Sequence, residues 1–252
     1  MIAERTEVKV SIIIPVYNEV HNLREVLDLV LRAPLPEGFT KEVVVVDDGS
    51  SDGTNLVVEE YAANGKVTGY HSIENGGKGT AIRKGLALAS GDVVLIQDGD
   101  LEYDPHDYIR MIVPFACCAA EVVYGSRFRG NAFGMSVKSL LANKTITFVA
   151  NLLYGAGITD EATAYKAFRA NVLRRLLLEC KRFEFCPEVT AKVCRMGYHT
   201  HEVPIGYHAR QFSEGKKIRG WDGVQALWVL LKYRFVSRAS IQQCRPPFSD
   251  AC

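Results

Sequence analysis

The chain has 252 residues, 48% of them hydrophobic and 23% charged, and its net charge of +1 argues against a broad nucleic-acid-binding surface. Its seven cysteines are an odd number without zinc-ligand spacing, which indicates reduced thiols in a cytosolic protein. Because the sequence shows no apolar signal region and no run of the roughly 18 apolar residues that span a membrane, we expect a cytoplasmic protein that contacts the cytoplasmic membrane face at most peripherally.

The first half of the chain alternates buried strands with helices. Strands are predicted at 8–15, 42–46, 67–71 and 93–96, and helices at 22–31, from Ser50 or Ser51 to 61, and at 80–89. This alternation predicts a doubly wound, mostly parallel α/β sheet flanked by helices. Ligands of such sheets bind beyond the carboxyl ends of the strands, where this sequence places its polar clusters.

The stretch 93–105, VVLIQDGDLEYDP, is an apolar strand followed by an acidic segment. Asp98 and Asp100 have the same parity, so their carboxylates point to one side of an extended segment, and Gly99 between them allows close backbone approach. Two hard carboxylates at a strand end are suited to Mg²⁺ or Mn²⁺ on a diphosphate. A polar turn without a ligand is the competing interpretation.

Two further polar clusters follow strands. The sequence DDGSSDGT at 47–54 provides Asp48 as a carboxylate for ligand donors, whereas a turn or helix cap is the alternative. In NGGKG at 75–79 the glycines would admit a ligand closely and Lys78 would meet a phosphate, unless the segment is only a flexible surface turn.

The second half has a different pattern. Helices are predicted at 108–119, 136–154, 172–179, 185–196 and 221–235, and strands at 121–124, 165–168 and, as an edge strand, 199–207. A basic loop covers 210–219. Helices 136–154 and 220–235 mix apolar with basic residues, which is typical of helices in a membrane interface but also of ordinary packing on a sheet.

These motifs resemble, in order and spacing, the family 2 inverting glycosyltransferases of the GT-A fold. The resemblance rests on PVYNE at 15–19, DDGSSDGT, NGGKG and QDGD at 97–100. Later motifs are similar to those of the polyprenyl-phosphate sugar synthases, such as the dolichyl-phosphate mannose and glucose synthases: GSR at 125–127, Thr159-Asp160, the 183–189 segment, EVPI at 202–205 and Arg210 with GKKI at 215–218. The resemblance covers about 8–235.

The resemblance implies one GT-A domain over 1–237 with an irregular tail at 238–252. A nucleotide-sugar half would span about 8–105, and an acceptor half with its own helices about 106–237. It further implies that Asp98, Asp100 and Glu102 hold Mg²⁺ or Mn²⁺, which acts as a Lewis acid on the leaving diphosphate. The donor would be GDP-mannose or UDP-glucose, contacted by Pro15, Tyr17, Glu19, Asp48, Lys78, Gln97, Asp98 and Gly99.

The acceptor decides the reaction class. A sugar hydroxyl needs a general base, whereas a phosphate monoester, with its second pKa at about 6, is already an anion at neutral pH. Many hydroxyl-directed relatives carry a Glu-Asp pair as the base, and this sequence has only Asp160-Glu161 nearby. The acceptor phosphate would instead meet cations, and the proposed set is Arg127, Arg210, Lys216 and Lys217.

The predicted function is therefore that of an inverting, metal-dependent hexosyltransferase that moves mannose or glucose to polyprenyl phosphate. Its catalytic set would be Asp98, Asp100, Arg127, Arg210 and Asp160, with Asp160 orienting acceptor or sugar. Transfer to a glycan hydroxyl and a catalytically silent nucleotide-sugar-binding subunit remain open alternatives. A nucleotidyltransferase is disfavoured because the first strand runs into PVYNE instead of a glycine-rich phosphate loop.

Overall fold

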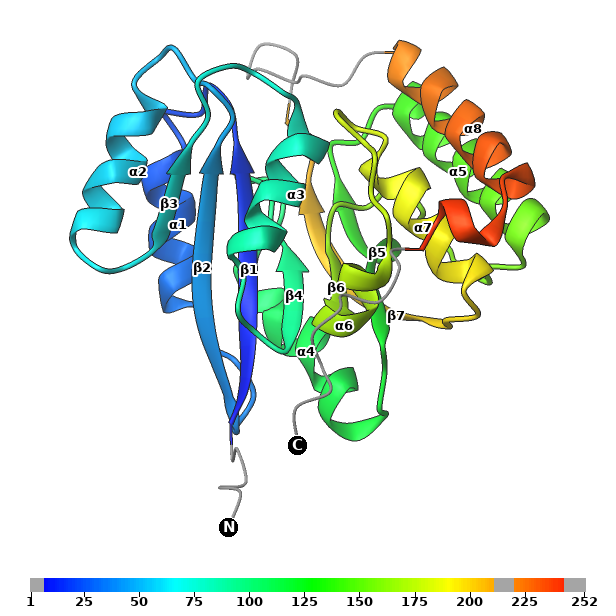
Figure 1. Ribbon diagram of the computed structural model, residues 1–252, viewed down its shortest axis with the longest axis horizontal. Coiled ribbons are helices and arrows are strands. Elements are labelled where there is room, and N and C mark those ends of the chain that lie inside the picture. Colours follow the sequence, from blue (N-terminus) through cyan, green and yellow to red (C-terminus); the bar gives the residue numbers. More distant parts are fainter. Residues whose placement is uncertain (1–6, 211–219, 243–252) are drawn as a thin grey trace.

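A seven-stranded sheet runs through the centre of the molecule, with helices on both of its faces (Figure 1). The computed structural model describes residues 7–210 and 220–242. In spatial order the strands are β3 (Thr68–His71), β2 (Phe39–Asp47), β1 (Val8–Val16), β4 (Val93–Ile96), β6 (Lys166–Arg169), β5 (Val122–Phe133) and β7 (Thr200–His208).

Alternating side chains of the central strands form two cores, one on each face of the sheet. Ile12 and Ile14 of β1 belong to a cluster with residues of α1 (Leu23–Arg32), α2 (Thr54–Ala63) and α4 (Tyr108–Cys117). Ile13 belongs to the cluster on the opposite face, with residues of α3 (Lys78–Leu88), α6 (Ala170–Arg175) and α7 (Phe185–Arg195). Burial on both faces explains why these strands read as continuous apolar runs.

The predicted mostly parallel sheet is confirmed. β1 pairs in parallel with β2 and β4, β2 with β3, and β5 with β7. β6 is the exception, because it runs antiparallel to both of its neighbours, β4 and β5. The two halves of the chain therefore share one continuous hydrogen-bonded sheet.

Glu42 of β2 links this strand by hydrogen bonds and an ion pair to β1 and to the turn before β4. Its carboxylate accepts hydrogen bonds from Ser11 Oγ at 2.5 Å and from the Ser90 backbone at 2.6 Å, and it pairs with Lys9 Nζ at 2.5 Å. Burial alone would raise the pKa of Glu42, but these donors outweigh it and lower the pKa to about 2. The ionised side chain therefore stabilises the folded state.

Most elements end within a few residues of their predicted bounds, and three differences are larger or change the kind of structure. The strand predicted at 121–124 continues to Phe133 as β5, with a bulge between Ser126 and Asn131 in its pairing with β7. The helix predicted at 172–179 ends at Arg175, because Leu176 instead forms a bridge with Gln242. The tail predicted as irregular begins with a short 3-10 turn, Arg238–Ser240, and Ile241 after it is fully buried.

Helices α5 (Val137–Tyr154) and α8 (Gly220–Phe235) lie side by side over α7 (Figure 1). They share a third apolar cluster, which includes Ile146, Ala150, Ala226 and Leu230. Within the described residues, no helix combines the length and the apolar character that crossing a membrane requires.

Candidate active site

The predicted donor-side residues gather where β1, β2 and β4 end. β1 and β2 end level, because Val16 is in register with Asp47, and β4 ends at Ile96, opposite Ile13 of β1. Pro15 is buried at the end of β1, and Tyr17 beyond it is partly exposed. The sheet topology therefore brings together motifs that are far apart in the sequence, from Pro15 to Asp100, as the doubly wound arrangement predicts.

Asp48 anchors the glycine-rich turn. Its buried carboxylate accepts hydrogen bonds from the backbone N–H of Gly76 at 3.0 Å and of Gly77 at 2.6 Å. Gly77 has φ of +88°, and a Cβ there would lie 2.5 Å from the carbonyl oxygen of Lys181. The turn therefore needs glycine at this position and presents its backbone beside the end of β2.

Lys78 forms an ion pair with Asp98, although the sequence analysis assigned it to a phosphate. Burial would lower the pKa of the Lys78 ammonium, but the charge and hydrogen bond of Asp98, together with other nearby negative charges, outweigh burial and raise it. Lys78 is therefore a fixed cation at the first turn of α3. It lies against the carboxylate that is expected to face the diphosphate.

Arg210, which follows β7, contacts two acidic residues of the first half. Its Nη2 donates to Asp100 Oδ2 at 2.5 Å, and its Nη1 lies 3.2 Å from both carboxylate oxygens of Glu19. Its buried Nε has no hydrogen-bond partner among the described residues. Burial and the nearby charge of Asp98 raise the pKa of Asp100 to about 7, against the opposing charge of Arg210. The site therefore concentrates negative charge that needs a cation.

The expected three-carboxylate metal set is not assembled among the described residues, where no group of three acidic, histidine or cysteine side chains is arranged around an ion position. Glu102, the expected third ligand, instead accepts hydrogen bonds from the Arg210 backbone at 2.8 Å and from the Tyr207 hydroxyl at 3.1 Å. Asp98 and Asp100 still fit a divalent ion, because they are hard oxygen donors whose mutual repulsion a cation would relieve. Lys78 and Arg210 supply that positive charge in this structure.

Gln97 and Gly99 hold the Asp98–Asp100 turn in place. Gln97 is fully buried, and its Oε1 accepts hydrogen bonds from the Tyr108 hydroxyl at 2.7 Å and the Tyr165 hydroxyl at 2.5 Å. A Cβ at Gly99 would lie 2.5 Å from Val16 Cγ1, so the turn approaches β1 closely. In this structure Gln97 thus holds the turn through buried hydrogen bonds. The spacing of Tyr108 and Tyr165 in the sequence does not indicate that they are its partners.

On the acceptor side, Arg127 and Asp160 form a buried, bidentate pair. Arg127 Nε donates to Asp160 Oδ2 at 2.7 Å, and Nη2 donates to Oδ1 at 2.8 Å. Glu202 holds the segment beside them by accepting from the backbone N–H of Thr159 at 2.8 Å and of Asp160 at 3.1 Å. Glu202 belongs to the EVPI motif at 202–205, and the sequence alone does not indicate this anchoring role.

Tyr207 connects the donor-side and acceptor-side groups. Its hydroxyl donates to Glu102, and its ring lies 5.0 Å from the guanidinium carbon of Arg127. No sequence signal indicated this residue. Lys216 and Lys217, the other two predicted phosphate ligands, lie outside the described residues.

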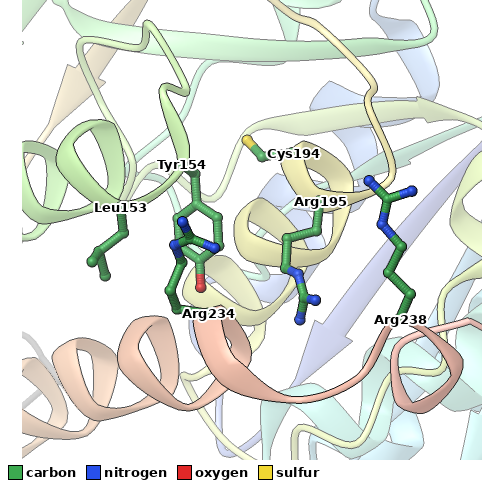
Figure 2. Close-up of a pocket in the computed structure, with 6 residues that line it drawn as sticks. All are labelled: Leu153, Tyr154, Cys194, Arg195, Arg234 and Arg238. Carbon is green, nitrogen blue, oxygen red and sulfur yellow. The ribbon is translucent and has the colours of Figure 1, made fainter.

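A separate pocket of about 370 Å³ lies between α5, α7, α8 and the 3-10 turn, away from the strand ends (Figure 2). It contains none of the predicted site residues. Its lining is basic, and consists of Leu153, Tyr154, Cys194, Arg195, Arg234 and Arg238.

Known proteins resemble this chain in sequence and in fold. The sequence model of the family described as "Glycosyl transferase family 2" matches residues 11–177. An undecaprenyl-phosphate mannosyltransferase of Micrococcus luteus is 32% identical over 226 residues, which cover 85% of this chain and 90% of the relative. An undecaprenyl-phosphate 4-deoxy-4-formamido-L-arabinose transferase of Aeromonas hydrophila is 30% identical over 216 residues, 84% of this chain. The chain spans 64% of the length of that relative.

Solved structures share the architecture at low sequence identity. Glucosyl-3-phosphoglycerate synthase of Mycobacterium tuberculosis aligns with a TM-score of 0.68 at 18% identity, covering 92% of this chain and 82% of that chain. This likeness concerns the fold, which is the GT-A fold that the sequence predicts. The family match, which covers about two thirds of the sequence, shows that the chain belongs to glycosyl transferase family 2.

Proposed function

We propose that this glycosyltransferase moves a sugar from a nucleotide-sugar to polyprenyl phosphate, with inversion and with a divalent ion held by Asp98 and Asp100. The names of the relatives support the identity of the acceptor more strongly than the identity of the sugar. Their names share undecaprenyl phosphate but differ between mannose and a formamido-arabinose. We further propose a hexose, mannose or glucose, carried by GDP or UDP.

On the donor side, the strand ends would receive the nucleotide diphosphate. Asp98 and Asp100 would hold Mg²⁺ or Mn²⁺, with Glu102 close enough in sequence to join after it releases its present partners. A bound ion would stabilise the charge that develops on the departing diphosphate. Lys78 would contribute a second positive charge there, and Asp48 keeps the Gly76–Gly77 backbone beside the end of β2.

The acceptor class rests on one observation: the carboxylate of Asp160 is fully buried and engaged by Arg127 through both oxygens. In this arrangement it is not available as the general base that a sugar hydroxyl requires. A phosphate dianion needs no base, only cations that position it for in-line attack on the anomeric carbon. Arg210, whose Nε has no hydrogen-bond partner among the described residues, would position it, and Arg127 would add its positive charge while it stays paired with Asp160.

The test is incubation with polyprenyl phosphate, labelled GDP-mannose or UDP-glucose, and Mn²⁺, followed by extraction into organic solvent. We expect label in the lipid phase, and loss of that label with EDTA. Label found only on soluble sugars would contradict the lipid acceptor and favour transfer to a glycan hydroxyl. Neither transfer nor metal-dependent donor hydrolysis with any nucleotide-sugar would instead indicate a silent binding subunit.

A further inference from the structure

Helix α8 carries an apolar stripe that faces away from the protein. The stripe follows a spacing of three and four residues, which places its members on one helix face. Its three aromatic members are strongly exposed, Trp221 at 73%, Trp228 at 66% and Phe235 at 82%, and Val224 and Leu231 lie between them. A different set, Ala226, Val229, Leu230 and Tyr233, makes the contacts with the core. The helix therefore has two apolar faces, and only one is covered in the described structure.

Helix α5, beside α8, repeats this arrangement. Val137, Leu141, Phe148 and Leu152 share one face and are 65–80% exposed, whereas Ile146, Thr147 and Ala150 are buried. We call the nine exposed residues of the two stripes the α5–α8 apolar face. Soluble monomers rarely expose large apolar patches without a binding role, and here two neighbouring helices each expose an apolar stripe.

The charges on these two helices are mostly positive, although Lys232 is already paired with Glu179 at 3.2 Å. The described ranges 137–154 and 220–242 contain one acidic residue, Asp222, and five basic ones: Lys138, Lys144, Lys232, Arg234 and Arg238. Two copies of the face would bring like charges together. A bilayer with anionic lipids would complement them, and exposed Trp side chains are suited to its interface.

The basic pocket lies at the C-terminal end of the same two helices (Figure 2). Arg195 is fixed there by the carbonyl oxygens of Tyr233 at 2.7 Å and Val236 at 2.6 Å. Among the described residues, none of the ion pairs involves Arg195, Arg234 or Arg238. Three guanidinium groups around one hollow favour an oxyanion such as phosphate.

We propose that the α5–α8 apolar face docks onto the interface of a bilayer containing anionic lipids, and that the basic pocket takes a lipid headgroup phosphate. The reason for docking rests on the proposed function, because a polyprenyl phosphate acceptor would be located in a membrane. The surface itself is separate from the strand ends that would bind the donor.

Intrinsic fluorescence tests the docking directly, because Trp221 and Trp228 are the two tryptophans of the whole chain. With vesicles of phosphatidylcholine and phosphatidylglycerol, we expect a blue shift of the emission, protection from acrylamide and co-flotation of the protein. Added salt should weaken binding, and pure phosphatidylcholine vesicles should bind less. Unchanged emission together with no co-flotation at low salt would overturn the proposal.

Variants separate the face from the pocket while both tryptophans stay in place. Leu231→Gln with Phe235→Ser should abolish vesicle binding, and Arg234→Gln with Arg238→Gln should weaken binding to anionic vesicles by about 30-fold. The matched control is Leu56→Gln with Ile73→Gln, which replaces two exposed apolar residues elsewhere and should bind like the wild type. Equal losses in the control and the face variant would refute a specific surface. Circular dichroism checks that each variant is folded.

Two further measurements decide between occupants and between proposals. A dimer in analytical ultracentrifugation that the Leu231→Gln, Phe235→Ser variant converts to a monomer would assign the face to a second copy and overturn membrane docking. Transfer to polyprenyl phosphate in detergent tests the proposed function without vesicles. If the wild type binds vesicles but transfers nothing in detergent, the proposed function fails and the docking surface stands.

Discussion

The Arg127–Asp160 pair gives the sharpest test of the acceptor side, because both side chains are almost completely buried, at 6% and 0% exposure. Asp160→Asn preserves the shape but removes the negative charge, and leaves a buried guanidinium without its counter-charge. Removing one partner of a buried pair typically costs about 3–5 kcal/mol. This is a large share of the about 5–15 kcal/mol by which a domain is stable.

Urea denaturation measures this loss. With an m-value of about 3 kcal/mol/M for a domain of this size, the unfolding midpoint should fall by about 1–1.7 M. Adding Arg127→Met to Asp160→Asn should restore most of the loss, because the buried charge disappears while Asn can still accept from the backbone N–H at 127. Arg24→Gln is the matched control, since it breaks an ion pair with Glu60 that is half exposed. A midpoint change for Asp160→Asn no larger than that of the control would refute the reasoning.

Three further variants test the donor side and the stability of the sheet. Asp98→Asn or Asp100→Asn should lower metal-dependent transfer by about 10²-fold, whereas Asp104→Asn, in the same stretch but half exposed, should leave it unchanged in the organic-phase assay. Gly77→Ala should lower stability by about 1–3 kcal/mol in urea, because its φ of +88° and the close carbonyl oxygen exclude a side chain. Glu42→Gln should lower the thermal midpoint at neutral pH. Because folding depresses the pKa of Glu42 from 4.5 to about 2, its contribution is complete above pH 4.5 and is lost as the pH falls to about 2, where variant and wild type should converge.

Each of these expectations has its contrary result. Full transfer activity in both carboxylate variants, or an equal loss of activity in Asp104→Asn, would refute the assignment of Asp98 and Asp100 as ligands of the ion. A Gly77→Ala protein of unchanged stability would mean that the turn can adopt another conformation. A Glu42→Gln difference that persists unchanged at pH 2 would mean that its effect is not electrostatic.

The sequence predicts the donor half of the fold well because its signals there are local. Apolar runs such as 93–96 have few alternatives to a buried strand, and the parallel topology then places Asp48 and Asp98 at one edge. Element ends were less predictable. The helix at 172–179 stops early because Leu176 pairs with Gln242, a contact that no local pattern encodes.

The partners of the site residues were beyond sequence reasoning for the same reason. Arg210 meets Asp100 across 110 positions, and Arg127 meets Asp160 across 33. The sequence shows that each of these residues is charged, but not that the cations and carboxylates neutralise each other. The assignment of four free cations to an acceptor phosphate therefore stays a prediction, and the two arginines of that set already have carboxylate partners in the fold.

The antiparallel insertion of β6 between β4 and β5 has a mechanical consequence. Since the ladder is unbroken from β3 to β7, the regions that would hold donor and acceptor cannot swing apart as two rigid bodies without tearing backbone hydrogen bonds. Any movement that admits substrate and releases product must then come from the loops that follow the strands. Crosslinks between β4 and β6 should therefore leave turnover intact.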